Sequence, residues 1–413
     1  MSRRLLFVTT RLPWPENSGR KVSLTQYCRG LHERYGYEIA LFVFPEWDGA
    51  RDAEGKPPFI SQVHFAAPIS RARKCVGLAG ALLSGKPLQQ ALYTSGKNRR
   101  LLQQLTEEFK PDVVMFDMIR LAPYMKALRS NARRILDLDD LLSVRYARQL
   151  KAGASNVSIA GYYAGGLPTL VDRALCRGAL GRLILKAEQK RVERAEIAYS
   201  RHADGVVLVS AEEAKELNRR LGEEKAVAVP LGVSLPPTPD VTKQPRTFGF
   251  VGNMHVAANV ASLDLIVREI LPKLTPPFTF EIAGPIPSDV RARFKDTPGL
   301  TFLGEVPSLA PVLASWQFSL CPIAFGSGLK TKVLEAMAAE LPALTNTVGA
   351  EGIGAESGKE LIVENDPCAL ARAANALLDD PLACQRIGRE ARTFVTREFS
   401  WERAFDAFSH LNL

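Results

Sequence analysis

A lysine and a glutamate that follow a glycine-rich segment are the first residues whose types and spacing could do chemistry. Lys330 lies just after Gly326-Ser327-Gly328, where strong helix-forming residues predict the start of a helix. A helix N-terminus can hold phosphate oxygens through its unpaired N–H groups and its dipole, and Lys330 would add a full charge there. Glu335 could accept hydrogen bonds from ribose hydroxyls. An ordinary strand–loop–helix connection with solvated side chains fits the same spacing.

Carboxylates at the ends of two predicted strands form a second group. One buried strand is predicted to end in Asp117, and the next, at residues 134–140, contains Asp137, Asp139 and Asp140 at its end. Open parallel α/β sheets bind ligands at the carboxyl ends of their strands, so these acids are candidates for substrate contacts. The Asp-x-Asp spacing also fits a metal-binding pattern, although that motif is short and common.

Apolar runs and helical segments alternate along the chain, and they must position these side chains. The predicted strands lie at residues 4–9, 39–44, 111–117, 134–140, 205–210, 247–251, 279–284, 300–304, 318–322 and 343–346. The predicted helices lie at residues 22–33, 97–109, 124–129, 186–201, 259–271, 309–314, 330–339, 369–378 and 381–398. Such alternation is typical of α/β folds with parallel sheets.

The composition is that of an ordinary globular protein. With 413 residues, 46% hydrophobic and 23% charged, the chain is long enough for two domains, and a single small module is excluded. Its six cysteines have no metal-site spacing, which predicts reduced thiols and a cytoplasmic location. The N-terminus is predicted to be a first strand and not a signal peptide. No apolar run is long enough to predict a transmembrane helix.

The positive charge is unevenly distributed. Residues 1–239 contain 37 basic and 24 acidic side chains, whereas residues 240–413 contain 16 and 20. Residues 71–100 contain seven basic side chains and no acid around an apolar centre; they could lie on an anionic lipid surface or form two ordinary surface helices. Nucleic acid is a weaker hypothesis, because Tyr93 alone interleaves with the charges. Residues 143–187, also basic, could guide a lipid-bearing acceptor or form a lid or a helical insertion.

Residues 318–352 resemble the donor-binding signature of GT-B glycosyltransferases of the GT4-like group. That signature has a proline-ending strand, a GSG-x-K-x-K loop and an LEAMA helix, which correspond here to Pro322, residues 326–332 and residues 334–338. Residues 227–233 resemble the family's V-x-P-N/L-G-V segment, and Ser400-Trp401 resembles the F-S-W motif at the start of its final helix. The resemblance covers nearly the whole chain.

The resemblance implies a GT-B fold, with two Rossmann-like domains that face each other across a cleft. It places an acceptor-binding domain at residues 1–233, a linker at 234–246, a donor-binding domain at 247–395 and a helix at 396–413 that returns to the first domain. The implied reaction is retaining transfer from a UDP- or GDP-sugar to a saccharide or lipid-linked saccharide, with no metal, no cofactor and no nucleic acid. The basic charge of the first domain favours an acceptor at the inner face of a membrane.

The resemblance also implies roles for individual residues. The donor-binding residues are Gly19, Gly252, Asn253, His255, Asn259, Ser327, Gly328, Lys330, Glu335, Gly349 and Glu351. The acceptor side consists of Ser18, Arg20, Asp117, Asp139 and Asp140. Lys330, Glu335 and Asp139 would be catalytic. The chain departs from the family where Arg20 replaces a glycine, where Ser327 replaces a first glutamate, and where Asp139 and Asp140 stand in place of a histidine and an aspartate.

Two alternatives remain open at this stage. A nucleotide-sugar 2-epimerase of the same fold would need acids and a histidine around the sugar. A catalytically inactive GT-B subunit would bind a partner or a membrane and would retain nucleotide binding without turnover.

Overall fold

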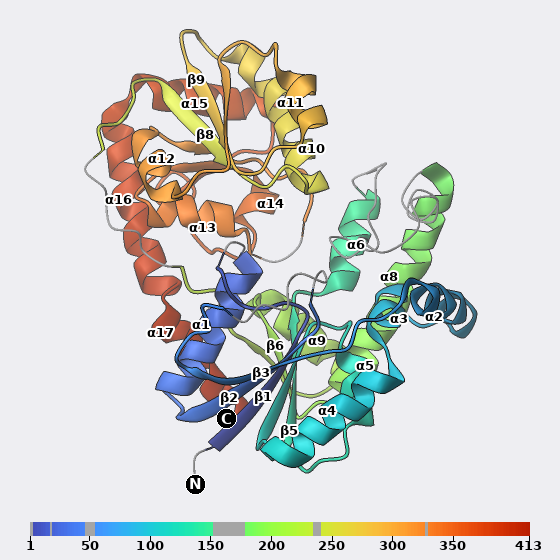
Figure 1. The fold of residues 1–413 in the computed structure, drawn as a ribbon. Coiled ribbons are helices and arrows are strands. Elements are labelled where there is room, and N and C mark those ends of the chain that lie inside the picture. The colour runs from blue at the N-terminus through green and yellow to red at the C-terminus, as the bar shows by residue number, and fades with distance from the viewer. Residues whose placement is uncertain (1–2, 17–18, 46–53, 152–177, 234–240, 327–328) are drawn as a thin grey trace. The chain divides into compact units, whose positions relative to one another are not determined.

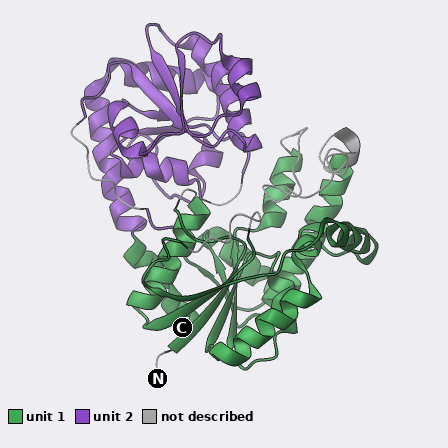
Figure 2. Ribbon diagram, in the orientation of Figure 1, with its two compact units in different colours: residues 1–230, 401–413 green, residues 231–400 purple. Residues whose placement is uncertain are grey.

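The computed structural model describes residues 3–16, 19–45, 54–151, 178–233, 241–326 and 329–413. The chain divides into two compact units: unit 1 comprises residues 1–230 and 401–413, and unit 2 comprises residues 231–400 (Figure 2). Each unit has a parallel β-sheet with helices packed against it (Figure 1). Among the described helices, none has both the length and the hydropathy that a membrane crossing requires.

Unit 1 contains a seven-stranded parallel sheet in the order β3-β2-β1-β4-β5-β6-β7. The strands are β1 (Arg3–Thr9), β2 (Tyr37–Val43), β3 (Ile60–Phe65), β4 (Val113–Asp117), β5 (Arg133–Asp139), β6 (Gly205–Leu208) and β7 (Ala226–Ala228). The chain runs outward from β1 in one direction and then returns to β4 on the other side. This reversal lies between β1 and β4, which is where an open α/β sheet has its ligand-binding switch point.

Helices cover the sheet of unit 1, and two buried glutamates of one of them bind backbone groups of two neighbouring helices. The helices are α1 (Gly19–Glu33), α2 (Arg71–Ser84), α3 (Leu88–Tyr93), α4 (Gly96–Phe109), α5 (Ala122–Ala127), α6 (Leu142–Lys151), α8 (Gly178–Ser200), α9 (Ala211–Leu221) and α17 (Trp401–Ala407). Glu188 accepts a hydrogen bond from the Leu88 N–H at 2.7 Å, and Glu196 accepts one from the Ser143 N–H at 3.1 Å. These carboxylates satisfy N–H groups that α3 and α6 leave unpaired at their starts.

The last residues of the chain complete the core of unit 1. The Phe408 ring packs edge-on against Tyr27 of α1, with ring centroids 5.1 Å apart. A Cβ on Gly30 would lie 2.3 Å from the ring of Phe405, so α1 needs glycine at this position for α17 to approach it. The Asn412 carbonyl accepts a hydrogen bond from Arg133 of β5. The C-terminal segment is therefore part of unit 1, although unit 2 precedes it in the sequence.

Unit 2 contains a six-stranded parallel sheet in the order β10-β9-β8-β11-β12-β13. The strands are β8 (Thr247–Val251), β9 (Thr279–Ala283), β10 (Leu300–Gly304), β11 (Ser319–Leu320), β12 (Ala343–Thr345) and β13 (Ile362–Val363). The helices are α10 (Ala257–Leu265), α11 (Ser288–Phe294), α12 (Leu309–Ser315), α13 (Thr331–Ala338), α14 (Thr347–Ala350), α15 (Pro367–Asp379) and α16 (Pro381–Glu398). The switch point of this sheet lies between β8 and β11.

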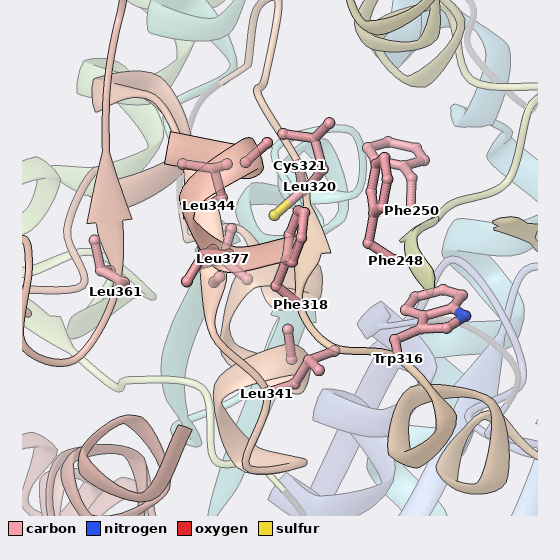
Figure 3. Close-up of a cluster of buried hydrophobic side chains, with 14 of the residues drawn as sticks. Phe248, Phe250, Trp316, Phe318, Leu320, Cys321, Leu341, Leu344, Leu361 and Leu377 are labelled. Carbon is pink, nitrogen blue, oxygen red and sulfur yellow. The ribbon is translucent and has the colours of Figure 1, made fainter. Parts of the chain in front are cut away.

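Aromatic residues fill the core of unit 2 around β8 and β11 (Figure 3). Phe248 stacks on Phe318 with ring centroids 4.7 Å apart and planes inclined by 8°. The ring of Trp316 occupies the space beside Gly249, where a Cβ would lie only 2.2 Å from it, and the indole N–H donates to Glu281 at 2.7 Å. Burial of each large ring contributes about 2–3 kcal/mol and fixes the strands whose ends carry the loops described below.

The alternation of strands and helices predicted from the sequence is confirmed, and the differences have local causes. The helix predicted over residues 259–271 is α10 followed by a π-turn at Ile266–Ile270 and a 3₁₀ turn at Leu271–Lys273. Pro272 has no N–H to continue the helix. Strand β3 was not predicted, because an edge strand with the polar residues Ser61, Gln62 and His64 lacks an apolar run.

Candidate functional site

Three carboxylates surround one guanidinium at the strand ends of unit 1. Arg20, in the first turn of α1, donates to Asp117 at 2.6 Å, to Asp137 at 2.6 Å and to Asp139 at 3.1 Å. Asp117 ends β4, while Asp137 and Asp139 lie in the last residues of the neighbouring strand β5, so the parallel register brings them together. Thr10, just after β1, donates to Asp117 through its N–H and its hydroxyl. We call Arg20, Asp117, Asp137 and Asp139 the Arg20 cluster.

Burial and the positive charge of Arg20 act in opposite directions on the pKa values of the three acids in the Arg20 cluster. Burial raises the pKa of Asp137 to about 6 despite the attraction of Arg20, and Asp117 and Asp139 raise it further by repulsion. Burial also raises the pKa of Asp139 above its usual value. For Asp117 burial acts the same way, but Arg20, Arg11 and the Thr10 hydroxyl outweigh it and hold the pKa below its usual value. The three acids are therefore inequivalent.

The backbone at these strand ends is strained, which sets where the side chains lie. Asp139 has a φ of +65° and Met118, directly after β4, has a φ of +66°. A left-handed conformation costs a residue other than glycine roughly 1–2 kcal/mol. The turn directs Asp139 to Arg20, whereas Asp140 accepts hydrogen bonds from Arg145 of α6. Asp139 is also the most accessible acid of the cluster, because 24% of its side chain is exposed while Asp117 and Asp137 are fully buried.

The acids of the Asp-x-Asp sequence, Asp137 and Asp139, form ion pairs with Arg20. Both carboxylates bind the same guanidinium, which lies where the metal-binding interpretation would put a cation. Within the described ranges, no group of three or more His, Cys, Asp and Glu residues is arranged to hold a metal ion.

In unit 2, Lys330 lies directly before helix α13. Its Nζ atom is 3.9 Å from the Glu351 carboxylate, and its side chain is largely buried. Its carbonyl accepts the Val333 N–H at 2.9 Å and so starts the helix. The aliphatic part of Lys330 passes Gly326, where a Cβ would lie 3.2 Å from the Lys330 Cε. Lys330 and Glu351 thus lie in the segments that follow two neighbouring strands, β11 and β12, and this places them close together.

Lys332, which the sequence analysis did not include among the site residues, lies at the centre of a second group in unit 2. It donates a hydrogen bond to Asn259 of α10, and its ammonium lies 4.6 Å from the ring centroid of Phe250. Burial lowers the pKa of Lys332 to about 8. Glu335 lies one turn further along α13; burial raises its pKa, and the charge of Lys332 opposes that shift. The feature of the sequence that could have pointed to Lys332 is the second lysine in Lys330-Thr331-Lys332.

The loop between β8 and α10 is held by side-chain hydrogen bonds. Asn259 donates to the Asn253 carbonyl at 2.8 Å, and the Asn253 side chain accepts from the His255 N–H at 2.9 Å. Gly284, with a φ of +132°, approaches this loop so closely that a Cβ would lie 2.3 Å from the Gly252 carbonyl oxygen. Gly284 therefore allows two strand-end loops to touch, while His255 is exposed to solvent.

Asn346, which was not among the residues predicted from the sequence, organises the next loop. Its side chain donates to the Ile323 carbonyl and accepts from the N–H groups of Ile323 and Gly349. Gly349 packs against Thr345, where a Cβ would lie 1.9 Å from the hydroxyl oxygen. Asn346 thus joins the loop after β11 to the start of α14, just before Glu351.

The structure brings some of the predicted residues together and leaves others apart. In unit 1, Arg20, Asp117 and Asp139 come together beside Gly19, while Asp140 pairs with Arg145. In unit 2, Lys330 pairs with Glu351, whereas Glu335 and Asn259 lie around Lys332. Ser18, Ser327 and Gly328 lie outside the described residues.

Part of the sequence matches known proteins. Residues 245–380 match the family model described as Glycosyl transferases group 1. A stretch of 82 residues is 35% identical to a glycogen synthase of Mycobacterium tuberculosis and covers 19% of this chain and 20% of that protein. The match therefore spans about a fifth of the length of that relative.

Solved structures resemble the whole chain. A sucrose-phosphate synthase from Thermosynechococcus elongatus is 15% identical, with a TM-score of 0.68 and coverage of 99% of this chain and 98% of that one. HepE of Anabaena, in complex with UDP-glucose, is 13% identical, with a TM-score of 0.65 and coverage of 98% of each chain. Identities this low establish the fold alone. The predicted GT-B fold and the resemblance to GT-B glycosyltransferases are confirmed.

Proposed function

We propose that this protein is a retaining glycosyltransferase that takes a sugar from a nucleoside diphosphate sugar bound by unit 2. The acceptor would be a hydroxyl of a saccharide or lipid-linked saccharide bound by unit 1. The observation that carries the proposal is the match of residues 245–380 to group 1 glycosyl transferases, because that stretch contains Lys330, Lys332, Glu335 and Glu351 in the arrangement described above. A uridine nucleotide is favoured, since the similar protein HepE was solved with UDP-glucose.

Lys330 and the start of α13 would hold the diphosphate. As the bond between the anomeric carbon and the phosphate oxygen breaks, negative charge develops on the leaving group. The Lys330 ammonium and the N–H groups of the first turn of α13 would stabilise that charge. Glu351, 3.9 Å from the ammonium, would keep the lysine aimed at this position.

Glu335 would bind the ribose hydroxyls, with Lys332 as its positioning residue. A carboxylate must be ionised to accept hydrogen bonds from both hydroxyls, yet burial raises the pKa of Glu335. The ammonium of Lys332, held by Asn259 and the Phe250 ring, opposes that shift. The Lys332 group therefore favours the charged form that the donor needs.

On the acceptor side, Asp139 would accept a hydrogen bond from the attacking hydroxyl. It is the accessible acid of the Arg20 cluster, and Arg20 fixes its position from one side. The new bond forms between the acceptor oxygen and the anomeric carbon on the face from which the phosphate leaves, and the hydroxyl proton passes to the departing phosphate oxygen. Asp117 and Asp137, fully buried, would hold Arg20 in place.

Thermal unfolding with a panel of UDP, GDP, dTDP, ADP and CMP, each alone and as its sugar conjugate, tests the donor site. A ligand present at about 100 times its dissociation constant stabilises the folded protein by about 2.7 kcal/mol. We expect a shift with one nucleotide family, and release of that nucleotide when a suitable acceptor is added. Absence of any shift would contradict the proposal. A shift without turnover on any acceptor would favour the inactive-subunit alternative, and a change in the sugar of the donor alone would favour the epimerase.

A further inference from the structure

Helix α2 of unit 1 exposes an apolar stripe to solvent. The helix is anchored on one side only, through the buried residues Leu78 and Ala81. On another side, Ala72, Val76, Ala79 and Leu83 follow one another at spacings of four, three and four residues, and all are exposed. This spacing puts them on one face of the helix. Val76 is 73% exposed and Leu83 is 91% exposed, so the sequence places large apolar groups where none of the described residues of unit 1 covers them.

A groove lies beside this stripe. It has a volume of about 1140 Å³ and is lined by residues of α2, α3, α4, α5 and the end of α8. Four basic side chains line it: Arg73, Lys86, Arg99 and Lys126. No aspartate or glutamate is among its described lining residues. The Lys126 ammonium lies 4.9 Å from the ring centroid of Tyr199 in the wall. The groove is therefore apolar in its walls and positive in its charge.

The combination of apolar stripe and unbalanced positive charge restricts what can cover this surface. A second copy of the chain would bring two acid-free basic segments, residues 71–100, face to face, and like charges across an interface are unfavourable. An anionic lipid interface satisfies both features, since acyl chains take up the apolar side chains while phosphates attract the cations. None of the described helices is long and apolar enough to cross a bilayer, so the contact proposed here is one with the bilayer surface.

We propose that this surface, formed by Val76 and Leu83 of α2 with Arg73, Lys86, Arg99 and Lys126 of the adjacent groove, docks on a bilayer that contains anionic phospholipids. Val76 and Leu83 enter the boundary between headgroups and acyl chains, and the four cations bind lipid phosphates. The inference stands independently of the transferase reaction, because it uses no residue of the Arg20 cluster or of unit 2.

Co-sedimentation of the full-length protein with vesicles tests the proposal. One set of vesicles consists of phosphatidylcholine, and the other contains in addition about 30 mol% phosphatidylglycerol to supply the negative surface potential. We expect binding to the anionic vesicles only, and its loss in about 0.5 M salt, where charge interactions at the surface are screened.

Two double variants separate the apolar and the charged contributions. Val76→Ser with Leu83→Ser should lower the partition coefficient about tenfold or more, because two apolar side chains no longer enter the lipid. Arg73→Gln with Lys86→Gln should lower it about 25-fold, since each basic residue near an anionic surface contributes about a factor of five. The matched controls are Leu382→Ser, at a residue that is 74% exposed in unit 2, and Lys295→Gln with Arg386→Gln. These controls should bind as the unmodified protein does.

Several results would overturn the proposal. They are equal binding to both kinds of vesicle, no binding to anionic vesicles, or unchanged binding by the two double variants of the α2 surface. A dimer in size-exclusion chromatography that Val76→Ser with Leu83→Ser converts to a monomer, together with no vesicle binding, would assign the stripe to self-association instead. All variants change exposed side chains, and an unaltered unfolding temperature confirms that each one folds.

Discussion

The two units contrast in where their charges lie. The first 239 residues carry the excess of basic side chains, yet the strand-end site of unit 1 gathers three carboxylates around Arg20. The remaining residues carry a small excess of acids, yet the strand-end loop of unit 2 presents Lys330 and Lys332. The overall charge of a unit therefore does not predict the charge of its site. The basic excess of unit 1 includes the groove beside α2, away from the Arg20 cluster.

The two sites also differ in the ion pairs that their cations make. Arg20 is buried and makes hydrogen bonds of 2.6–3.1 Å to three acids, while the Lys330 ammonium lies 3.9 Å from Glu351. Breaking an ion network of this kind lowers the stability of the protein, because an uncompensated charge remains buried. Substitutions in the two sites should therefore have different consequences.

The largest expected effect comes from Arg20→Leu. Removing the guanidinium breaks the ion pairs of the buried Asp117 and Asp137, and we expect unit 1 to lose about 3–5 kcal/mol of unfolding free energy. Urea denaturation measures this loss, and Arg386→Leu on the surface of unit 2 is the control. A loss below about 1 kcal/mol would mean that the network does not stabilise unit 1 as its geometry implies.

Asp139→Asn should affect activity and leave stability nearly unchanged. Asparagine tolerates the left-handed backbone at this position and can still accept from Arg20, but it lacks the charge that binds the attacking hydroxyl. We expect kcat to fall about 10- to 100-fold, because a hydrogen bond to a charged group contributes about 1.5–3 kcal/mol. Steady-state kinetics with the donor found in the nucleotide panel would show it. Full activity in this variant would remove Asp139 from the acceptor site.

The pH dependence of stability should have opposite signs in the two units. Burial raises the pKa of Glu196 to about 8 and that of Glu188 to about 7, so folded unit 1 binds protons more tightly than the unfolded chain. Unit 1 should then lose stability as the pH rises from about 5 to 8. Burial lowers the pKa of Lys332 to about 8, so unit 2 should gain stability from about pH 8 to 9, below the range in which the raised pKa values of the Cys321 and Cys384 thiols oppose it.

Two neutral variants test this contrast. Glu196→Gln keeps hydrogen bonds to the Ser143 N–H and hydroxyl and should stabilise unit 1 at pH 8 by on the order of 2 kcal/mol, with little effect at pH 5. Lys332→Met should flatten the pH dependence of unit 2 in calorimetric scans by about 1 kcal/mol. If both variants keep the pH profile of the unmodified protein, the buried charges do not titrate as their surroundings imply.

The sequence predicted more of the fold than of the site. Strands such as Thr247–Val251 were evident because a parallel sheet covered on both faces gives continuous apolar runs. Lys330 and the acids at the ends of β4 and β5 were evident because loops follow those runs. Lys332 was not assigned, and Asp137 was given no role beyond its place at a strand end, because their partners Asn259 and Arg20 lie more than 70 residues away and only the order of the strands brings them together.

Calorimetric titration of the preferred nucleoside diphosphate into the unmodified protein and into Lys330→Ala tests most directly the claim that unit 2 holds the donor at this loop. Loss of a charged hydrogen bond should weaken binding by about 1.5–3 kcal/mol, while Lys295→Ala, at an exposed lysine of the same unit, should leave the affinity unchanged. Equal affinity in the unmodified protein and in Lys330→Ala would contradict the account and remove Lys330 from the site.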